Sequence, residues 1–241
     1  MPTLSQVGQV RLKLYAIALA AAVSVSCSAG VGKEEPAFNH QRPASDERLI
    51  NRDPAKEASV TASLSPQRPR IISRQEWKAK DAAGQMQPHT VRRITIHHTA
   101  SPQKKGVAIE KKMQALQNFS QGRSRLASGG YKPAWPDVPY HYYIAVDGQI
   151  AEGRDIKYVG DTNTDYDPTG HALVVLEGNF EKEQPSARQL ESLREMVAWL
   201  SAGYGIPASE IKGHNDYAST ACPGARLKGE LIRIRREVGE I

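Results

Sequence analysis

Apolar and polar positions along the chain follow the periods of short strands. Residues 92–98, RRITIHH, alternate isoleucine with polar neighbours, which predicts a half-buried strand. Residues 171–178, HALVVLEG, form a compact apolar run that suits a central strand. Residues 140–153, YHYYIAVDGQIAEG, contain two short apolar runs around Asp147 and Gly148, and this dipeptide is a strong signal for a β-hairpin.

Helical periods occur between and after these strands. Apolar residues recur at roughly helical spacing in residues 106–119, and residues 225–238 predict a closing helix. Residues 185–205 begin with Ser186 and Gln189 in the spacing of a capping box and end in glycines, which predicts a helix. Strands that alternate with helices, together with one hairpin, indicate an α/β fold with a mixed central β-sheet flanked by helices.

The first thirty residues have the pattern of an export signal. Arg11 and Lys13 precede the apolar run 14–26, which has no polar face and is too short for a comfortable transmembrane helix. We therefore expect a signal peptide over residues 1–29 and export of the protein to the cell envelope.

The end of this signal, VSVSCSAG, resembles the cleavage box of bacterial lipoproteins. The resemblance implies that Cys27 becomes the lipidated first residue and that Ser28 directs the protein to the outer membrane. Ser24 departs from the pattern, which prefers leucine at that position. The alternative is ordinary cleavage after Ala29, which would give a soluble periplasmic or secreted protein.

Residues 30–68 are rich in Pro, Ala, Ser and charged residues and lack apolar periodicity. Such a segment buries too little apolar surface to offset the entropy of ordering. We interpret it as a disordered tether, and residues 69–241 as one folded domain.

Composition and charge narrow the partners only slightly. The chain has 241 residues, of which 39% are hydrophobic and 24% charged, and a formal net charge of +6 at pH 7. This balance favours anionic partners such as an acidic wall polymer. The basic residues are scattered with little aromatic interleaving, so we expect no nucleic-acid partner. No heptad pattern indicates obligate pairing, and we expect a monomer.

The cysteine of the predicted domain, Cys222, has no second cysteine to pair with and therefore needs a chemical explanation. The chain has 2 cysteines, and with Cys27 in the signal, Cys222 is left alone in an exported domain. His214 precedes it by eight positions, and strand alternation allows either His97 or His98 to face the same site. Three such ligands with one open position are typical of catalytic zinc. The alternative is that Cys222 is a small buried apolar residue and His214 a loop histidine with satisfied hydrogen bonds.

Four motifs in order carry a resemblance: RRITIHHTAS, YHYYIAVDGQIAEGRD, LEGNF and GHNDYASTACPG. Together they resemble the zinc amidase family that includes phage lysozyme-type amidases and peptidoglycan recognition proteins, over roughly residues 70–235. The opening IISRQEW is similar to the start of the recognition-protein branch. The resemblance implies a peptidoglycan recognition protein-like fold with a zinc site in a surface groove, and cleavage of the amide between N-acetylmuramic acid and L-alanine.

The resemblance also implies roles for single residues. One Zn²⁺ per chain is held by three ligands, with His98 turned away: His97, His214 and Cys222. Tyr140 matches a tyrosine that points its hydroxyl at the reacting water. Thr220 occupies a position that carries lysine in the phage enzyme and often threonine in the recognition proteins. Peptidoglycan or muropeptides are the implied partners.

Two departures from the family pattern bear on catalysis. Some relatives place a general-base glutamate where this chain has Val175. Glu177 lies two residues on, on the same face of the strand, and it either takes a catalytic role or serves as a cap or a substrate contact. The family often has a histidine directly after a Val-Gly pair in the loop beyond the hairpin, whereas this chain has Asp161 there. The sequence leaves open whether His171, at the end of this loop, takes its place. We expect His141 to be a packed or supporting histidine rather than a ligand.

Two functions follow from these residues. The first is a zinc-dependent N-acetylmuramoyl-L-alanine amidase, and the second is a recognition module that binds muropeptides without cutting them. Non-hydrolytic members of the family commonly lack the cysteine. Cys222, together with Tyr140, therefore favours the enzyme.

Overall fold

The computed structural model describes residues 66–125 and 130–239. All of them belong to the unit Asp53–Ile241, while the unit Met1–Arg52 lies outside the described residues. The predicted signal peptide 1–29 with Cys27, and the predicted tether 30–68 except its last three residues, also lie outside them.

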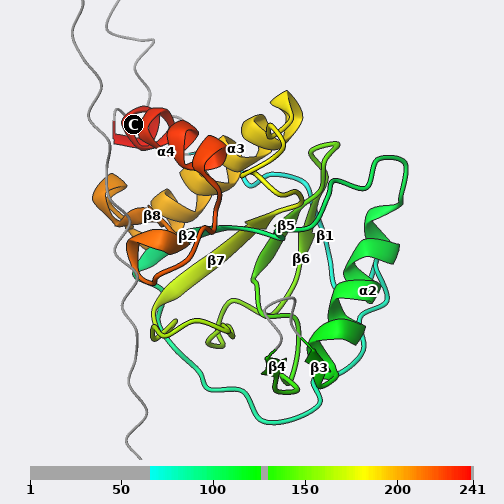
Figure 1. Cartoon of the computed structure of the whole chain (residues 1–241). Helices are drawn as coiled ribbons and strands as arrows, with labels where there is room; N and C mark the ends of the chain where they lie inside the picture. Colours follow the sequence, from blue (N-terminus) through cyan, green and yellow to red (C-terminus); the bar gives the residue numbers. More distant parts are fainter. Residues whose placement is uncertain (1–65, 126–129, 240–241) are drawn as a thin grey trace, which may run out of the picture. The chain divides into compact units, whose positions relative to one another are not determined.

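A six-stranded sheet forms the centre of the domain, with the order β1-β6-β5-β7-β2-β8 (Figure 1). β5 and β6 pair antiparallel, while β1–β6, β5–β7, β7–β2 and β2–β8 pair parallel. The bounds of the strands are β1 Ile71–Ile72, β2 Arg93–His98, β5 Tyr142–Ile144, β6 Ile150–Glu152, β7 His171–Leu176 and β8 Ile211–Gly213. A separate hairpin joins β3 (Ser124–Arg125) to β4 (Tyr131–Lys132). The sheet is mixed, as the sequence predicts.

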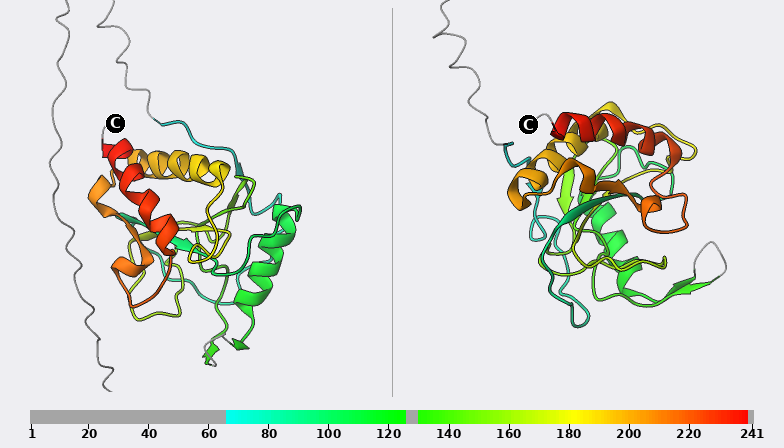
Figure 2. Two further views of the ribbon diagram at one scale, coloured as in Figure 1. Left: turned by 45° about the horizontal axis from the view of Figure 1, so that its top comes forward. Right: turned by 90° about the vertical axis from the view of Figure 1, so that its left-hand side faces the viewer.

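Helices cover both faces of the sheet. α3 (Ala187–Tyr204) and α4 (Ala225–Gly239) lie on one face and α2 (Ile109–Gln121) on the other (Figure 2). Two short 3₁₀ helices, η1 (Ala208–Glu210) and η2 (His214–Asp216), flank β8. The larger core joins α3 and α4 to the sheet, and a smaller core joins α2 to it.

Local signals in the sequence set several of these elements. The Ser186 hydroxyl accepts from the Gln189 backbone N–H and the Gln189 side chain accepts from the Ser186 backbone, so the predicted capping box begins α3. The predicted hairpin is confirmed as β5 and β6, with Gly148 at φ +86° in the turn. α2 begins at Ile109, later than the pattern predicts. Val107 precedes the helix and is 38% exposed, so it does not belong to the buried apolar face of α2.

The prediction of a half-buried β2 is wrong. Five of its six residues are buried, because β2 lies between two parallel neighbours and both faces of the sheet are covered. Ile94 and Ile96 pack in the larger core. Thr95 and His97 point to the opposite face, where hydrogen-bonding and charged groups collect. The polar positions that indicated exposure are therefore buried polar groups.

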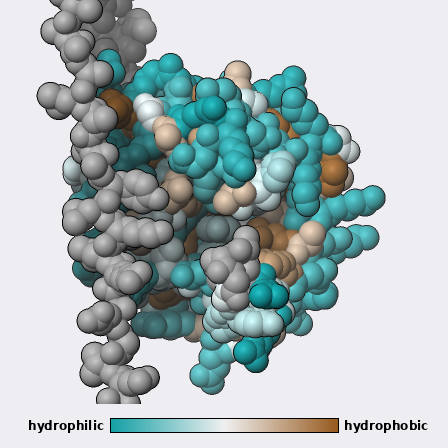
Figure 3. Space-filling model, viewed as in Figure 1, coloured by the Kyte–Doolittle hydropathy of each residue, from teal (hydrophilic) through white to brown (hydrophobic). Residues whose placement is uncertain are grey.

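The molecular surface is mostly hydrophilic on the face drawn in Figure 3, with hydrophobic residues in small groups. The large hydrophobic residues exposed within the described ranges are Val107, Phe119, Tyr131, Tyr204 and Ile232. Among the helices of these ranges, none combines the length and apolar character that crossing a membrane requires.

Two histidines tie β7 to the segment that precedes it. Nδ1 of His141 accepts from the backbone N–H of Leu173 at 2.8 Å, and its Nε2 lies 2.9 Å from the carbonyl oxygen of Tyr158. His89 makes the same pair of contacts, 2.8 Å from the N–H of Gly170 and 3.0 Å from the carbonyl oxygen of Ile156. An imidazole that accepts at Nδ1 and donates at Nε2 is neutral, so both bridges require the uncharged ring.

We predict that this requirement makes the fold sensitive to mild acid. Burial lowers the pKa of His141 to about 3, whereas the unfolded chain takes up the proton near its ordinary value of 6.5. The unfolded state therefore binds more protons below pH 6.5, and stability falls as the pH falls. Between pH 7.5 and 5.5 a histidine that stays neutral costs about 1.4 kcal/mol of unfolding free energy.

Urea unfolding of the wild type and of His141→Gln at these two pH values measures this effect. The variant should be less stable at pH 7.5 and should lose about 1.4 kcal/mol less than the wild type on acidification. An equal loss in both proteins would show that His141 does not couple folding to protonation.

Candidate metal centre

The pairing of β2 with β8 brings two distant histidines together. Ile96 lies opposite Gly213 in the parallel register, so His97 and His214 follow at the same end of neighbouring strands. Gly213 is required there, because a Cβ on it would lie 2.9 Å from both Asn215 Oδ1 and Pro223 Cδ. The chain turns into η2 directly after this glycine, and the turn carries His214 toward β2.

The segment after η2 folds back and returns Cys222 to the same point. The backbone N–H of Asn215 donates to the carbonyl oxygen of Cys222 at 2.8 Å, which closes the loop. Gly224 ends it at φ +92°, where a Cβ would lie 2.5 Å from the backbone of Phe180. The Sγ of Cys222 accepts from the backbone N–H of His98 at 3.3 Å.

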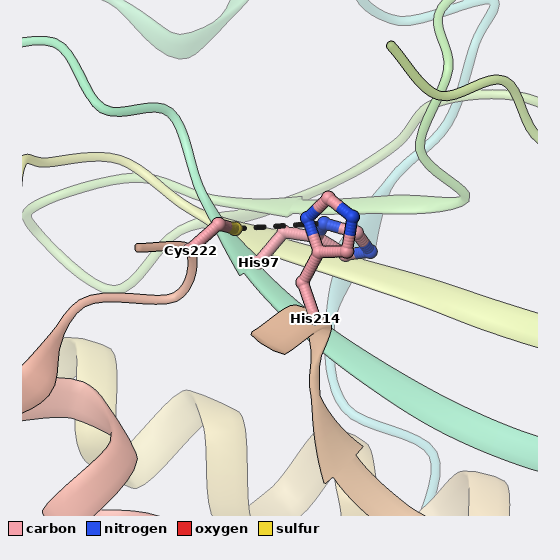
Figure 4. A group of neighbouring side chains, drawn as sticks. All are labelled: His97, His214 and Cys222. Atoms are coloured by element: carbon pink, nitrogen blue, oxygen red, sulfur yellow. Dashed lines mark hydrogen bonds between the residues drawn. The ribbon is translucent and has the colours of Figure 1, made fainter. Parts of the chain in front are cut away.

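Three side chains converge at this point. Their potential ligand atoms, from His97, His214 and Cys222, all lie within 4.8 Å of one another. Figure 4 shows the three side chains pointing toward a common centre from β2, from η2 and from the loop. The Sγ of Cys222 is 3.7 Å from Nδ1 of His97, and the two imidazole centroids are 4.5 Å apart.

Burial decides the protonation of the group in the absence of metal. It lowers the pKa of His97 well below 6.5 and the pKa of His214 to about 4, so both imidazoles are neutral at pH 7. It raises the pKa of the Cys222 thiol to about 12. A bound cation favours the thiolate and reverses that preference.

The donor set fits zinc, which the family resemblance implies. Tetrahedral Zn–S and Zn–N bonds of ordinary length place sulfur and nitrogen about 3.6 Å apart. The 3.7 Å between Cys222 Sγ and His97 Nδ1 is close to that value. The other nitrogen of His97, Nε2, is buried and makes no hydrogen bond within the described ranges. The potential ligand atoms of two neutral imidazoles and one thiol thus face one another, with Cys222 Sγ and His97 Nδ1 in contact.

Two further residues predicted for the site lie around this group. The ring of Tyr140 is 5.2 Å from the ring of His97, and burial raises the pKa of its hydroxyl, so it stays protonated. The Thr220 hydroxyl accepts from the backbone N–H of Cys222 at 3.2 Å. Thr220 thus holds the cysteine loop, and any contact of Thr220 with substrate stays a prediction.

Three other histidines of the described residues lie outside the group. His98 faces α3 and α4, where its Nδ1 accepts from the backbone N–H of Phe180 at 3.2 Å. Nδ1 of His171 is 2.7 Å from the hydroxyl of Thr95, and its ring meets the edge of Tyr217 at 4.7 Å. His141 bridges backbone groups with both nitrogens, so it has no lone pair left for a metal.

Glu177 occupies a buried ion pair rather than the centre of the group. Its Oε2 is 2.7 Å from Nζ of Lys112 on α2 and 3.0 Å from the backbone N–H of Val146. Its Oε1 accepts from the backbone N–H of Lys104 at 2.9 Å. Both oxygens are engaged, which favours a structural role that fastens α2 to the sheet. A catalytic role for Glu177 stays a prediction.

The sequence reasoning missed two residues that contact the group. The Thr164 hydroxyl lies 2.6 Å from Nε2 of His214, and the ring of Tyr166 lies 5.1 Å from the ring of His214. Both belong to the loop between β6 and β7. The departure of this loop from the family pattern was visible in the sequence, but nothing in its composition indicated a contact with His214.

The mixed sheet, its helices and this group define a class of protein, the peptidoglycan recognition protein-like amidase fold. The solved structure of Drosophila peptidoglycan recognition protein SD aligns with a TM-score of 0.59 at 26% identity, over 69% of this chain and 94% of that one. The amidase LysC from Clostridium intestinale shares the fold, with a TM-score of 0.56 at 24% identity over 71% of this chain and 98% of that chain.

The chain belongs to the N-acetylmuramoyl-L-alanine amidase family, whose sequence model matches residues 87–225. It is 30% identical to mouse peptidoglycan recognition protein 1 over 165 residues, which cover 65% of this chain and 83% of that protein. It is 29% identical over 163 residues to a pig N-acetylmuramoyl-L-alanine amidase, over 66% of this chain but only 26% of that protein. These relatives carry the names of both a recognition protein and a hydrolase.

We predict that Glu177→Gln and Lys112→Met lower stability without lowering zinc content. Removing one partner of a buried ion pair leaves the other charge uncompensated, at a cost of about 3–5 kcal/mol. The double variant leaves no lone charge and should recover part of that loss. Urea unfolding and metal analysis of the three variants measure both quantities. A Glu177→Gln protein of wild-type stability would contradict the structural role.

Proposed function

We propose that the protein hydrolyses the amide bond between N-acetylmuramic acid and L-alanine in peptidoglycan. The observation that carries the proposal is the convergence of His97, His214 and Cys222 to within 4.8 Å beside the Tyr140 ring. Membership of the amidase family supplies the bond that such a group would cut. A structure of Drosophila recognition protein LB with tracheal cytotoxin, at 26% identity, supports a muropeptide as the ligand.

The three ligands would hold one Zn²⁺ and leave a position open for water. When bound, the ion supplies Lewis acidity, which polarises a carbonyl and lowers the pKa of a water molecule to about 7. The Tyr140 hydroxyl stays protonated and donates a hydrogen bond to the carbonyl oxygen as negative charge develops on it. Thr220 and the backbone N–H of His98 hold Cys222 in place during the reaction.

A cavity of about 370 Å³ offers room for the peptide part of the substrate. Its lining combines apolar side chains of α2 with polar groups: Thr99, Ser101, Lys104, Lys112, Ala115, Leu116, Phe119, Tyr143 and Glu177. Thr99, which follows His97 by two positions, is part of this lining. Lys104 gives its rim a positive charge that suits the carboxylates of a stem peptide.

The alternative is a recognition module that binds muropeptides without cutting them. The intact cysteine argues against it, because recognition alone has no need of a partly buried thiol beside two neutral imidazoles. We propose further that residues 1–29 export the protein and that Cys27 anchors it by a lipid, which would place the enzyme next to its insoluble substrate.

We predict that the purified protein releases stem peptides that begin with L-alanine from peptidoglycan sacculi. Mass spectrometry of the products should show release with zinc, and none after chelation or in Cys222→Ser, because the metal would be lost. Cys27→Ser is the matched control, since it makes the same substitution outside the domain, and it should digest like the wild type. Sacculi that are bound but uncut, with one zinc per chain, would favour the recognition module instead.

We also predict that Tyr140→Phe lowers kcat about 10²–10³-fold, the effect of losing one donor to a developing oxyanion. Zinc content should stay at the wild-type value, because the phenol is no ligand. Tyr204→Phe, at the end of α3, serves as the control and should leave kcat unchanged. Wild-type turnover in Tyr140→Phe would remove the hydroxyl from the mechanism.

A further inference from the structure

The loop between β6 and β7 contacts the imidazole of His214 at Nε2. The Thr164 hydroxyl is 2.6 Å from Nε2 of His214, although the two residues are fifty positions apart. The same hydroxyl is 2.8 Å from the hydroxyl of Thr162. Thr162 also accepts from the backbone N–H of Thr164 at 3.1 Å, so the two threonines form a local turn that aims one hydroxyl at the imidazole.

These contacts leave only one nitrogen of His214 for a metal. Because Nε2 is engaged by Thr164, the free ring nitrogen is Nδ1. An imidazole that offers the lone pair of Nδ1 carries its proton on Nε2, and that proton is donated to Thr164. The Thr164 hydroxyl then donates to Thr162, whose oxygen accepts both from it and from the backbone. The hydrogen bonds run in one direction and end at a satisfied acceptor.

Aromatic packing fixes the plane of the same ring. The centroid of Tyr166 is 5.1 Å from that of His214, and Tyr166 stacks on Tyr217 at 5.9 Å. Rotation of the imidazole by half a turn would break the bond to Thr164. The loop thus fixes both the protonated nitrogen and the orientation of His214.

We infer that Thr164 is a positioning residue of the metal centre, which holds the Nε2–H of His214 and presents Nδ1 to the ion. The inference rests on the metal site of the proposed function, but it does not depend on amidase activity. Groups that orient a metal-binding histidine in this way typically contribute about 10–100-fold to metal affinity.

The test is the affinity for zinc, measured by competition with a chromophoric chelator in the absence of peptidoglycan. Thr164→Val keeps the shape and removes the hydroxyl, and it should bind zinc about 10–100-fold more weakly than the wild type. Thr164→Ser restores the hydroxyl and should recover the affinity. Thr169→Val changes an exposed threonine of the same loop and should bind like the wild type.

Zinc affinity of Thr164→Val equal to that of the wild type would overturn the inference. If Thr164→Val does not fold, ¹⁵N NMR of the metal-free wild type still decides it, since His214 should be protonated at Nε2, and protonation at Nδ1 would overturn it. A wild type that binds zinc but cuts no peptidoglycan would refute the proposed amidase and leave the role of Thr164 to be judged on affinity alone.

Discussion

The register of β2 between β7 and β8 is the constraint on which the grouping of His97, His214 and Cys222 depends. His97 lies opposite Val175 of β7, while Ile96 lies opposite Gly213 of β8. Since side chains alternate between faces, a shift of one residue would turn His97 toward α3 and α4 and bring His98 to the site. The packing of Ile96 in the larger core opposes that shift. The apolar residues of β2 therefore specify the face toward which its polar residues point.

Several polar side chains are buried on the face of the sheet toward α2. Thr95 and His97 lie two residues apart on β2, Glu177 follows the end of β7 directly, and all three are buried. Burial keeps the imidazoles neutral, which is the form that binds a metal and also the form that the His141 bridge requires. The same low polarity of the interior therefore serves both the site and the fold.

Much of this arrangement was accessible from the sequence, and its limits are physical. The capping box of Ser186 and the Asp147-Gly148 turn are local signals, and both elements form as predicted. The family resemblance was needed to assign three residues to one site: His97, His214 and Cys222. Spacing alone left the alternative that His214 is an ordinary loop histidine and Cys222 a small buried residue. The contact of Thr164 with His214 depends on the path of a whole loop, and no local pattern encodes such a path.

One buried arginine helps to hold that path. The Arg154 guanidinium donates to the carbonyl oxygens of Val138 and Asp137, at 3.0 and 3.2 Å, just before Tyr140. It also pairs with Asp161, three positions before Thr164. A single planar group thus contacts both the segment that leads through Tyr140 into β5 and the start of the loop that carries Thr164. The segment that carries Tyr140 and the loop that carries Thr164 are therefore both held by the same side chain, so disturbing Arg154 would displace both neighbours of the His97, His214 and Cys222 group together.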